Sequence, residues 1–191
     1  MPTAQLKKLS FRRSETGASI IELLTVASIV AVLALLAAPS LATHIESQRV
    51  KETVEQLKST LYFARSEAIK RGGFIAIQKI PSNSSDCQTA TSTLEWDCGW
   101  IVCNDTNNNG TCNATEPVLQ YIKTSGKVHV NRSAGGANIK INRWGLVDGA
   151  WLGFSLTPLA KTLGHPSARG VCMSSGGRIR VLAQKDIPCK A

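Results

Sequence analysis

The chain has 191 residues and a formal net charge of +9, a length that allows one modest domain together with a long helix. Its apolar residues are concentrated in one run, residues 18–38, in which Glu22 is the only charged residue. A helix needs about 20 apolar residues to cross a bilayer core, so this run is long enough to span a membrane. The rest of the chain is polar, which predicts a soluble domain carried on a single apolar segment.

The surplus of basic residues is divided between the segment before the apolar run and the rest of the chain. Four basic residues precede the apolar run, and the chain after residue 17 still contains 18 basic and 12 acidic residues. Such a surplus suits an anionic partner, although a solvated basic surface without a ligand has the same composition.

The segment before the apolar run ends in Gly17, and the chain continues as Ala-Ser-Ile-Ile-Glu-Leu-Leu-Thr-Val. A secretory signal is cut after an apolar stretch of about 7–15 residues, whereas here the glycine precedes a longer run. The pattern resembles the type IV prepilin family, whose signature is a glycine, four small or apolar residues, a glutamate and an apolar run. The resemblance implies that residues 1–17 are a leader peptide, which a prepilin peptidase removes by cutting between Gly17 and Ala18. It also implies methylation of the new amino terminus, although Ala18 stands where the family usually has phenylalanine.

Glu22 places a carboxylate in this apolar segment, at a cost of about 2.5–3.5 kcal/mol at the centre of a membrane helix and less near its end. One interpretation is a carboxylate tolerated near the interface. The other, implied by the pilin resemblance, is pairing with the positive amino terminus of a neighbouring subunit, which offsets the desolvation and sets the axial register. We favour the second interpretation, which assigns Glu22 to filament assembly with other pilin subunits as partners.

One long helix is predicted in two halves. Residues 18–42 form the transmembrane and filament-core half, with Pro39 at a position where pilin helices often bend. Residues 43–71 form an amphipathic half, because apolar residues recur there three and four positions apart: Val50, Val54, Leu57, Leu61, Ala64 and Ala68. Gly72 and Gly73 follow two cations and predict the end of the helix at Arg71.

Residues 72–191 are predicted to form a β-rich domain. Short alternating runs separated by Gly, Asn, Ser and Pro indicate strands at 74–80, 100–103, 118–123, 127–130, 138–142, 151–157, 170–173 and 178–183. The fold class is therefore α+β, with the long N-terminal helix packed on an antiparallel sheet, as in the pilin fold.

Short motifs in this domain indicate which branch of the pilin family the chain resembles. A Gly-Trp-Ile-Val strand beginning at Gly99, an Asp/Asn turn and Glu-Pro-Val-Leu from Glu116 are similar to the GspH/FimT branch of pilins and pseudopilins, as is a C-terminal Gly-Arg-x-Arg strand. The chain is most like a FimT-type minor pilin. The resemblance implies a single-pass protein of a Gram-negative inner membrane, with its domain in the periplasm, that later enters a type IV pilus on the cell surface.

Six cysteines follow the apolar run, and none belongs to a C-x-x-C pair, so a tetrahedral zinc site is not predicted. An even number in a translocated domain indicates disulfides. Fifteen connectivities are possible, and proximity in the sequence suggests Cys172–Cys189 and Cys103–Cys112, which leaves Cys87–Cys98.

One loop has the residues of a calcium-binding pattern. The D-x-[DN]-x-[DN]-G-x5-E spacing is complete in Asp105, Asn107, Asn109, Gly110 and Glu116. However, an EF-hand loop lies between helices, and this one follows a predicted strand. A hairpin tip closed by Cys103–Cys112 explains the same residues, so no metal or cofactor is predicted.

The segment from Gly176 to Arg180 carries two arginines in alternation. Arg178 and Arg180 are expected on one face of a strand, with Ile179 and Val181 toward the core, and arginine binds phosphate with a planar fork. A solvated strand face is the alternative on spacing alone. Resemblance to FimT-type minor pilins implies that Gly177, Arg178 and Arg180 bind the phosphate backbone of double-stranded DNA during natural transformation, with Lys185, Lys140 and Arg143 as candidates to extend the surface.

No catalytic set is found, because His44, His129 and His165 lack a nucleophile or metal-ligand motif around them. The predicted function is therefore a non-enzymatic minor pilin that binds DNA without sequence specificity. The alternative is a structural minor pilin or type II secretion pseudopilin, of the FimU or GspH kind, that primes filament assembly. A calcium-stabilised adhesive subunit is a third possibility.

Overall fold

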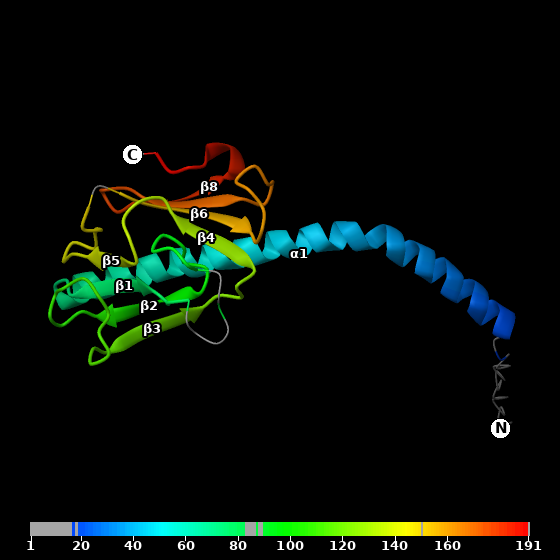
Figure 1. The fold of residues 1–191 in the computed structure, drawn as a ribbon, viewed down its shortest axis with the longest axis horizontal. Helices are drawn as coiled ribbons and strands as arrows, with labels where there is room; N and C mark the ends of the chain where they lie inside the picture. Colours follow the sequence, from blue (N-terminus) through cyan, green and yellow to red (C-terminus); the bar gives the residue numbers. More distant parts are fainter. Residues whose placement is uncertain (1–16, 18, 83–86, 88–89, 150, 191) are drawn as a thin grey trace, which may run out of the picture. The chain divides into compact units, whose positions relative to one another are not determined.

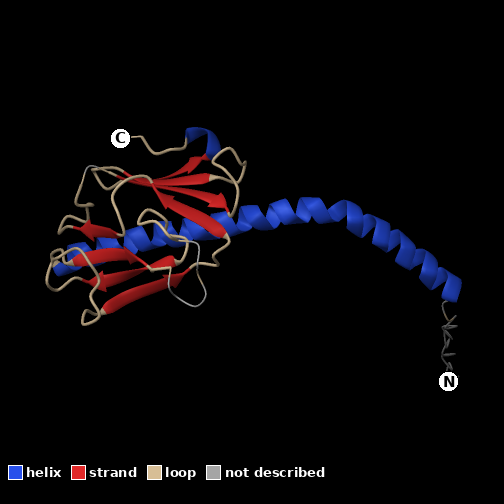
Figure 2. Cartoon of the chain, in the orientation of Figure 1, coloured by secondary structure: helices blue, strands red, loops and turns tan. Residues whose placement is uncertain are grey.

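The computed structural model describes residues 17, 19–82, 87, 90–149 and 151–190, with only the backbone of residues 36–40. Two compact units make up the chain, residues 1–42 and residues 43–191. A continuous helix, α1 (Ile20–Arg71), contributes to both units. Figure 1 shows the elements in chain order and Figure 2 the distribution of helix and strand.

The first unit contains the first half of α1. Every described side chain from 20 to 35 is exposed, and most of these side chains are large and apolar. Within the described residues, no helical stretch combines the length and hydropathy needed for a membrane span. The predicted span of residues 18–42 includes Ala18 and the side chains of residues 36–40, which lie outside the described part.

The second half of α1 buries the predicted stripe. All six of its members are at most 3% exposed: Val50, Val54, Leu57, Leu61, Ala64 and Ala68. Buried Trp100 donates its indole N–H to the hydroxyl of Thr60 on the same helix face, at 2.9 Å. The helix ends where predicted, because Gly72 has a φ of 75° and the N–H of Gly73 donates to the carbonyl of Ala68 at 2.7 Å.

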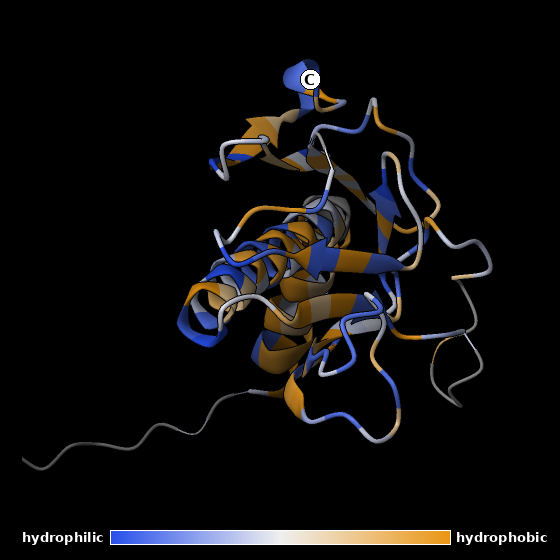
Figure 3. Cartoon of the chain, turned by 90° about the vertical axis from the view of Figure 1, so that its left-hand side faces the viewer, coloured by the Kyte–Doolittle hydropathy of each residue, from blue (hydrophilic) through white to orange (hydrophobic). Residues whose placement is uncertain are grey.

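Eight strands form two four-stranded antiparallel sheets about this half of the helix (Figure 1, Figure 3). The first sheet has the order β3-β2-β1-β5, from β1 (Ile75–Lys79), β2 (Gly99–Asn104), β3 (Val118–Lys123) and β5 (Asn138–Ile141). The second has the order β4-β6-β7-β8, from β4 (Val128–Arg132), β6 (Leu152–Pro158), β7 (Arg169–Met173) and β8 (Ile179–Ala183). A short 3-10 helix, η1 (Gln184–Asp186), follows β8.

The two sheets and the helix share one hydrophobic core. Ile77 and Ile139 belong to it from the first sheet, and Phe154 and Val171 from the second. The ring of Phe154 meets that of Trp96 edge-on, with centroids 5.3 Å apart. All the buried apolar residues of the described chain lie between residues 50 and 189, so residues 43–191 contain the whole described core.

The α+β prediction is confirmed, and the antiparallel strands prove to form two sheets. Each predicted strand is present, with ends that differ by up to two residues. The expectation for the last strand is wrong in two respects. Arg178 precedes β8, and Val181 is 42% exposed instead of facing the core. The physical reason is that β8 is the edge strand of its sheet, so Ile179 packs against the core and the later residues extend beyond it.

Candidate functional site

The predicted processing and assembly residues lie at the start of α1. Gly17 is exposed, and Ala18 lies outside the described residues, so cleavage between them stays a prediction. Glu22 is exposed in the first turn of the helix, where the N-terminal end of the helix dipole favours a negative charge.

Three disulfides join the cysteines in the same pairs that proximity in the sequence suggests. They are Cys87–Cys98, Cys103–Cys112 and Cys172–Cys189, with Cα atoms 5.5, 5.7 and 5.8 Å apart. Cys103–Cys112 closes the loop after β2, and Cys172–Cys189 ties the C-terminal segment to β7.

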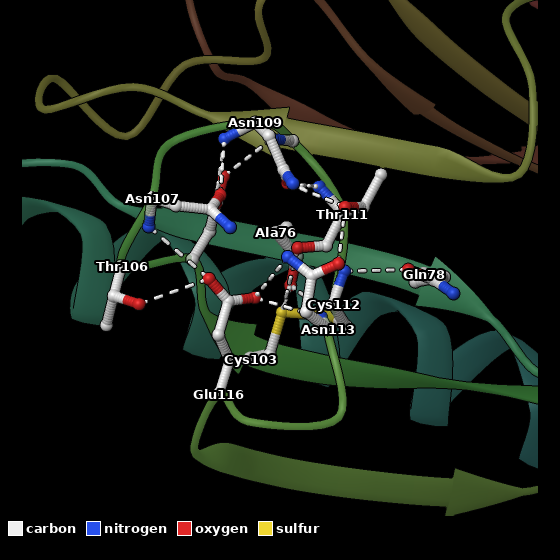
Figure 4. The surroundings of a disulfide bond; sticks show 12 residues. Ala76, Gln78, Cys103, Thr106, Asn107, Asn109, Thr111, Cys112, Asn113 and Glu116 are labelled. Atoms are coloured by element: carbon white, nitrogen blue, oxygen red, sulfur yellow. Dashed lines mark hydrogen bonds between the residues drawn. A yellow bond between two sulfur atoms is a disulfide. The ribbon is translucent and has the colours of Figure 1, made fainter.

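The loop with the calcium-like spacing is built around two carboxylates, those of Asp105 and Glu116, and Figure 4 labels the second. Asp105 is buried, and its two oxygens accept the backbone N–H groups of Asn109 and Gly110 at 2.9 and 2.7 Å. Glu116, also buried, accepts the N–H of Asn113 at 2.9 Å and that of Asn107 at 3.4 Å. The Asn113 bond is the main cause that holds the pKa of Glu116 below its usual value.

These bonds account for the pattern as loop structure. Asn107 and Asn109 each accept an N–H two residues further along, which is the local turn that Asn favours. The oxygens that would surround a calcium ion are therefore engaged with the loop's own N–H groups. Among the described residues, no group of three or more His, Cys, Asp or Glu side chains is placed to hold a metal ion.

The predicted Gly-Arg-x-Arg element begins in the turn between β7 and β8. Ser174 and Arg178 face each other across this turn, where the N–H of Ser174 donates to the carbonyl of Arg178 at 3.0 Å. Gly177 is buried with a φ of 79°, and its carbonyl accepts a hydrogen bond from the guanidinium of Arg65 on α1. A Cβ at Gly177 would lie 2.8 Å from Arg65 and 2.9 Å from Leu146, so this position requires glycine.

Arg180 borders two hollows, which we name by one residue of each. The Trp151 hollow, of about 310 Å³, is lined by Trp151, Cys172, Met173, Ser174, Ser175, Arg180 and Lys190. The Lys185 hollow, of about 450 Å³, is lined by Arg180, Leu182, Lys185, Asp186, Ile187 and Lys190. Two of the predicted residues, Arg180 and Lys185, are therefore brought together.

The other predicted cations lie elsewhere. Arg178 is exposed but lines neither hollow. Lys140 belongs to β5 in the other sheet, and its ammonium donates to the carbonyl of Asn108 at 2.9 Å. Arg143 is exposed in the loop after β5, three residues before Leu146, which adjoins Gly177.

Lys190 was not predicted, although it lines both hollows with Arg180. Its position near Arg180 could have been inferred because it directly follows Cys189, whose disulfide partner Cys172 lies on the strand beside β8. Trp151 lines the first of these hollows; the sequence favoured a core or sheet-face residue at this position, with stacking on a base as the alternative.

The three histidines have structural partners. His44 contacts Gln48 at 3.3 Å, and His165 lies 3.7 Å from Glu46. His129 Nδ1 lies 2.9 Å from a carboxylate oxygen of buried Asp97, and this hydrogen bond is the main cause that raises the pKa of His129.

Comparisons with known proteins agree with this fold. The family model of the type II transport protein GspH matches residues 53–177. The type IV minor pilin FimU of Pseudomonas aeruginosa is similar in two crystal forms, at 18% identity in each. The TM-scores are 0.54 and 0.52, and the alignments cover 75% and 72% of this chain and 95% and 96% of FimU.

A weaker similarity involves the minor pseudopilin EpsH of the Vibrio cholerae type 2 secretion system. Its TM-score is 0.47 at 14% identity, over 71% of this chain and 97% of EpsH. No curated protein sequence matches the chain significantly. The family match covers most of the chain and includes α1 from residue 53 and the seven strands from β1 to β7, and it ends at Gly177. The chain therefore belongs to the GspH family and has the fold of a minor pilin.

Proposed function

We propose that this GspH-family protein is a minor subunit of a pilus-like filament, either a type IV pilus or the pseudopilus of a type II secretion system. The observation that carries the proposal is the apolar first half of α1, where Ile20 is 79% and Leu35 77% exposed. A helix that is apolar all round is stable only when lipid or other helices cover it. The inner membrane supplies this cover before assembly, with the β-rich domain in the periplasm, and the helices of neighbouring subunits supply it afterwards.

Maturation and incorporation are tested on the full chain in a Gram-negative host with its own filament system. Mass spectrometry is expected to show loss of residues 1–17 and an amino terminus at Ala18 when a prepilin peptidase is present. Glu22→Gln is expected to leave this cleavage intact and to lower the amount of the protein in sheared filaments. Equal incorporation of Glu22→Gln and wild-type protein would contradict the role in assembly, and an uncut Gly17–Ala18 bond would contradict the prepilin assignment.

DNA binding is a second candidate function, of the kind that the FimT resemblance implies. The observation that favours it is the convergence of Arg180, Lys185 and Lys190 on one hollow, with exposed Arg178 two residues before Arg180 in the chain. Cations on a surface bind phosphates without reading the sequence, and such binding weakens steeply with salt. Lys140 and Arg143 contribute to the net charge and are expected to have smaller effects.

The test compares double-stranded DNA binding by residues 43–191 across a salt series. Arg178→Ala/Arg180→Ala is expected to remove the salt-dependent binding. The matched control, Arg49→Ala/Lys51→Ala, removes two exposed cations from α1 and is expected to bind like the wild type. Absence of wild-type binding at low salt, or equal losses in both variants, would contradict a specific role for the Arg178–Arg180 element and leave the filament subunit as the function.

A further inference from the structure

The outer face of the second sheet carries an aromatic ring and two lysines around a single arginine. Gly153, Cys172 and Arg180 form one row across β6, β7 and β8, because Gly153 pairs with Cys172 and Cys172 with Arg180. Leu152 and Phe154, the neighbours of Gly153 on β6, belong to the core, so the row lies on the face away from it.

Gly153 and Cys172 in this row hold Trp151 and the C-terminal segment over the sheet. A Cβ on Gly153 would lie 2.5 Å from the ring of Trp151 and 2.9 Å from Cβ of Cys189, so the absence of a side chain makes room for both. Cys172 binds Cys189 covalently, which holds the C-terminal segment over the sheet. Ile187 reinforces this placement, because its side chain lies 3.5 Å from the Cβ position of Gly170.

The C-terminal segment, held by the Cys172–Cys189 disulfide, supplies two of the three cations of the hollows. It carries Lys185 and Lys190, and Figure 1 shows it in red beside β8. Among the described residues, Arg180, Lys185 and Lys190 take part in no ion pair and no side-chain hydrogen bond, so their charges are available to a ligand. Of the residues that the structure describes, Asp186 is the one acidic residue that lines the Lys185 hollow, and none lines the Trp151 hollow.

We propose that the Trp151 hollow and the Lys185 hollow together bind a single-stranded nucleic acid, with one base against Trp151 and the adjoining phosphates at Arg180, Lys185 and Lys190. The half-buried ring of Trp151 offers a face for stacking, and Ser174 and Ser175 line the same hollow. A base can reach this ring only when it is unpaired, because the bases of a duplex stack on each other. The inference rests on the proposed DNA binding. It adds a contact with a base to the contacts with phosphate.

The volumes agree with this assignment. Sites for small organic groups occupy about 300–1,000 Å³, and the Trp151 hollow is at the lower end of this range, as suits one base. The larger Lys185 hollow adjoins it at Arg180, and the chain of the nucleic acid would continue there. Arg180 and Lys190 line both hollows, so the two cations lie between the base and the next phosphate.

The test uses the full chain in a neutral detergent and three fluorescent probes: oligo-thymidylate of twelve nucleotides, an abasic strand with the same number of phosphates, and a twelve-base-pair duplex. Fluorescence anisotropy at low salt measures each dissociation constant. The thymidylate strand is expected to bind about five- to a hundredfold more tightly than the abasic strand, because stacking of a base on an aromatic side chain has about this effect. It is also expected to bind more tightly than the duplex.

Two variants of Trp151 test whether this residue causes the preference for a strand with bases, and variants of Trp144 and Lys190 serve as comparisons. Trp151→Ala is expected to reduce binding of the thymidylate strand to the level of the abasic strand, and Trp151→Phe to keep most of the preference. Trp144→Ala removes a tryptophan that is 71% exposed on another loop and is expected to change nothing. Lys190→Ala is expected to weaken binding of both single strands by the same factor, since its contact is with phosphate.

The outcomes separate this inference from the proposal on which it rests. Equal affinity for the thymidylate and abasic strands, tighter binding of the duplex, or equal effects of Trp151→Ala and Trp144→Ala would overturn the base contact and leave phosphate binding intact. Absence of binding to all three probes would overturn both. Because the ring of Trp151 packs over Gly153, folding of its variants is checked by circular dichroism, and the wild-type comparison of the three probes decides the question if a variant fails to fold.

Discussion

The turn that presents Arg178 depends on Gly177, and replacing this glycine by alanine tests the dependence. Gly177 has a φ of 79°, a conformation that costs a residue with a Cβ about 1–2 kcal/mol. The new Cβ would also lie 2.8 Å from the guanidinium of Arg65 and 2.9 Å from Leu146. Arg65 would have to move and lose its hydrogen bond to the Gly177 carbonyl, at a further cost of about 1–2 kcal/mol.

Gly177→Ala is therefore expected to lower the free energy of unfolding of residues 43–191 by about 2–4 kcal/mol, the sum of these two effects. Urea unfolding followed by circular dichroism measures this quantity. Gly176→Ala is the matched control, because its φ is not in the left-handed region and the nearest atom to its Cβ position, Oγ of Ser174, is 4.0 Å away. A difference between the two variants below about 0.5 kcal/mol, the usual range of a neutral surface change, would refute the contact between the turn and Arg65.

Three further changes test the core, the C-terminal disulfide and a histidine pair. Leu61→Ala empties a fully buried position on α1 and is expected to destabilise residues 43–191 by about 2–5 kcal/mol in the same urea assay. Replacing Cys172 and Cys189 together by serine opens a loop with a sequence separation of 17 and is expected to cost about 3 kcal/mol; an unchanged urea midpoint would contradict this. His129 has a raised pKa because it hydrogen-bonds Asp97, so its stabilisation is full below the unfolded pKa of about 6.5 and is lost as the pH rises through the higher folded pKa. The urea midpoint of the wild-type protein is expected to decrease as the pH is raised from 5.5 to 8.5, and the decrease is expected to be smaller in His129→Gln. Equal decreases in both proteins would contradict the pairing.

The sequence predicted most of the fold because its signals are local. The spacing from Val50 to Ala68 sets which face of α1 is buried, and the glycines after Arg71 set where the helix ends. The same holds for the disulfides, since each joins cysteines that are near neighbours in the chain. The loop from Asp105 to Glu116 was also predicted as a hairpin, because Asn and Asp form turns with their own backbone.

The arrangement of strands in sheets could not be predicted in this way. Alternation along a strand shows which residues share a face, but it does not show whether the strand has neighbours on both sides. Val181 alternates with Arg180 as a core residue would, and it is exposed because β8 is an edge strand. Lys140 and Arg180 were grouped by charge alone, whereas β5 and β8 belong to different sheets.

The two proposed functions depend on different units of the chain, which makes them separable by mutation. Glu22 and the exposed apolar residues of the first half of α1 belong to residues 1–42, whereas Arg180, Lys185 and Lys190 belong to residues 43–191. The described core lies entirely in the second unit, so Glu22→Gln removes no contact from the β-rich domain. Likewise, Arg180→Ala changes an exposed side chain on the outer face of β8 and leaves α1 unaltered. A variant that assembles without binding DNA, and another that binds DNA without assembling, are therefore the expected pair, and loss of both properties in either variant would show that the two functions are coupled.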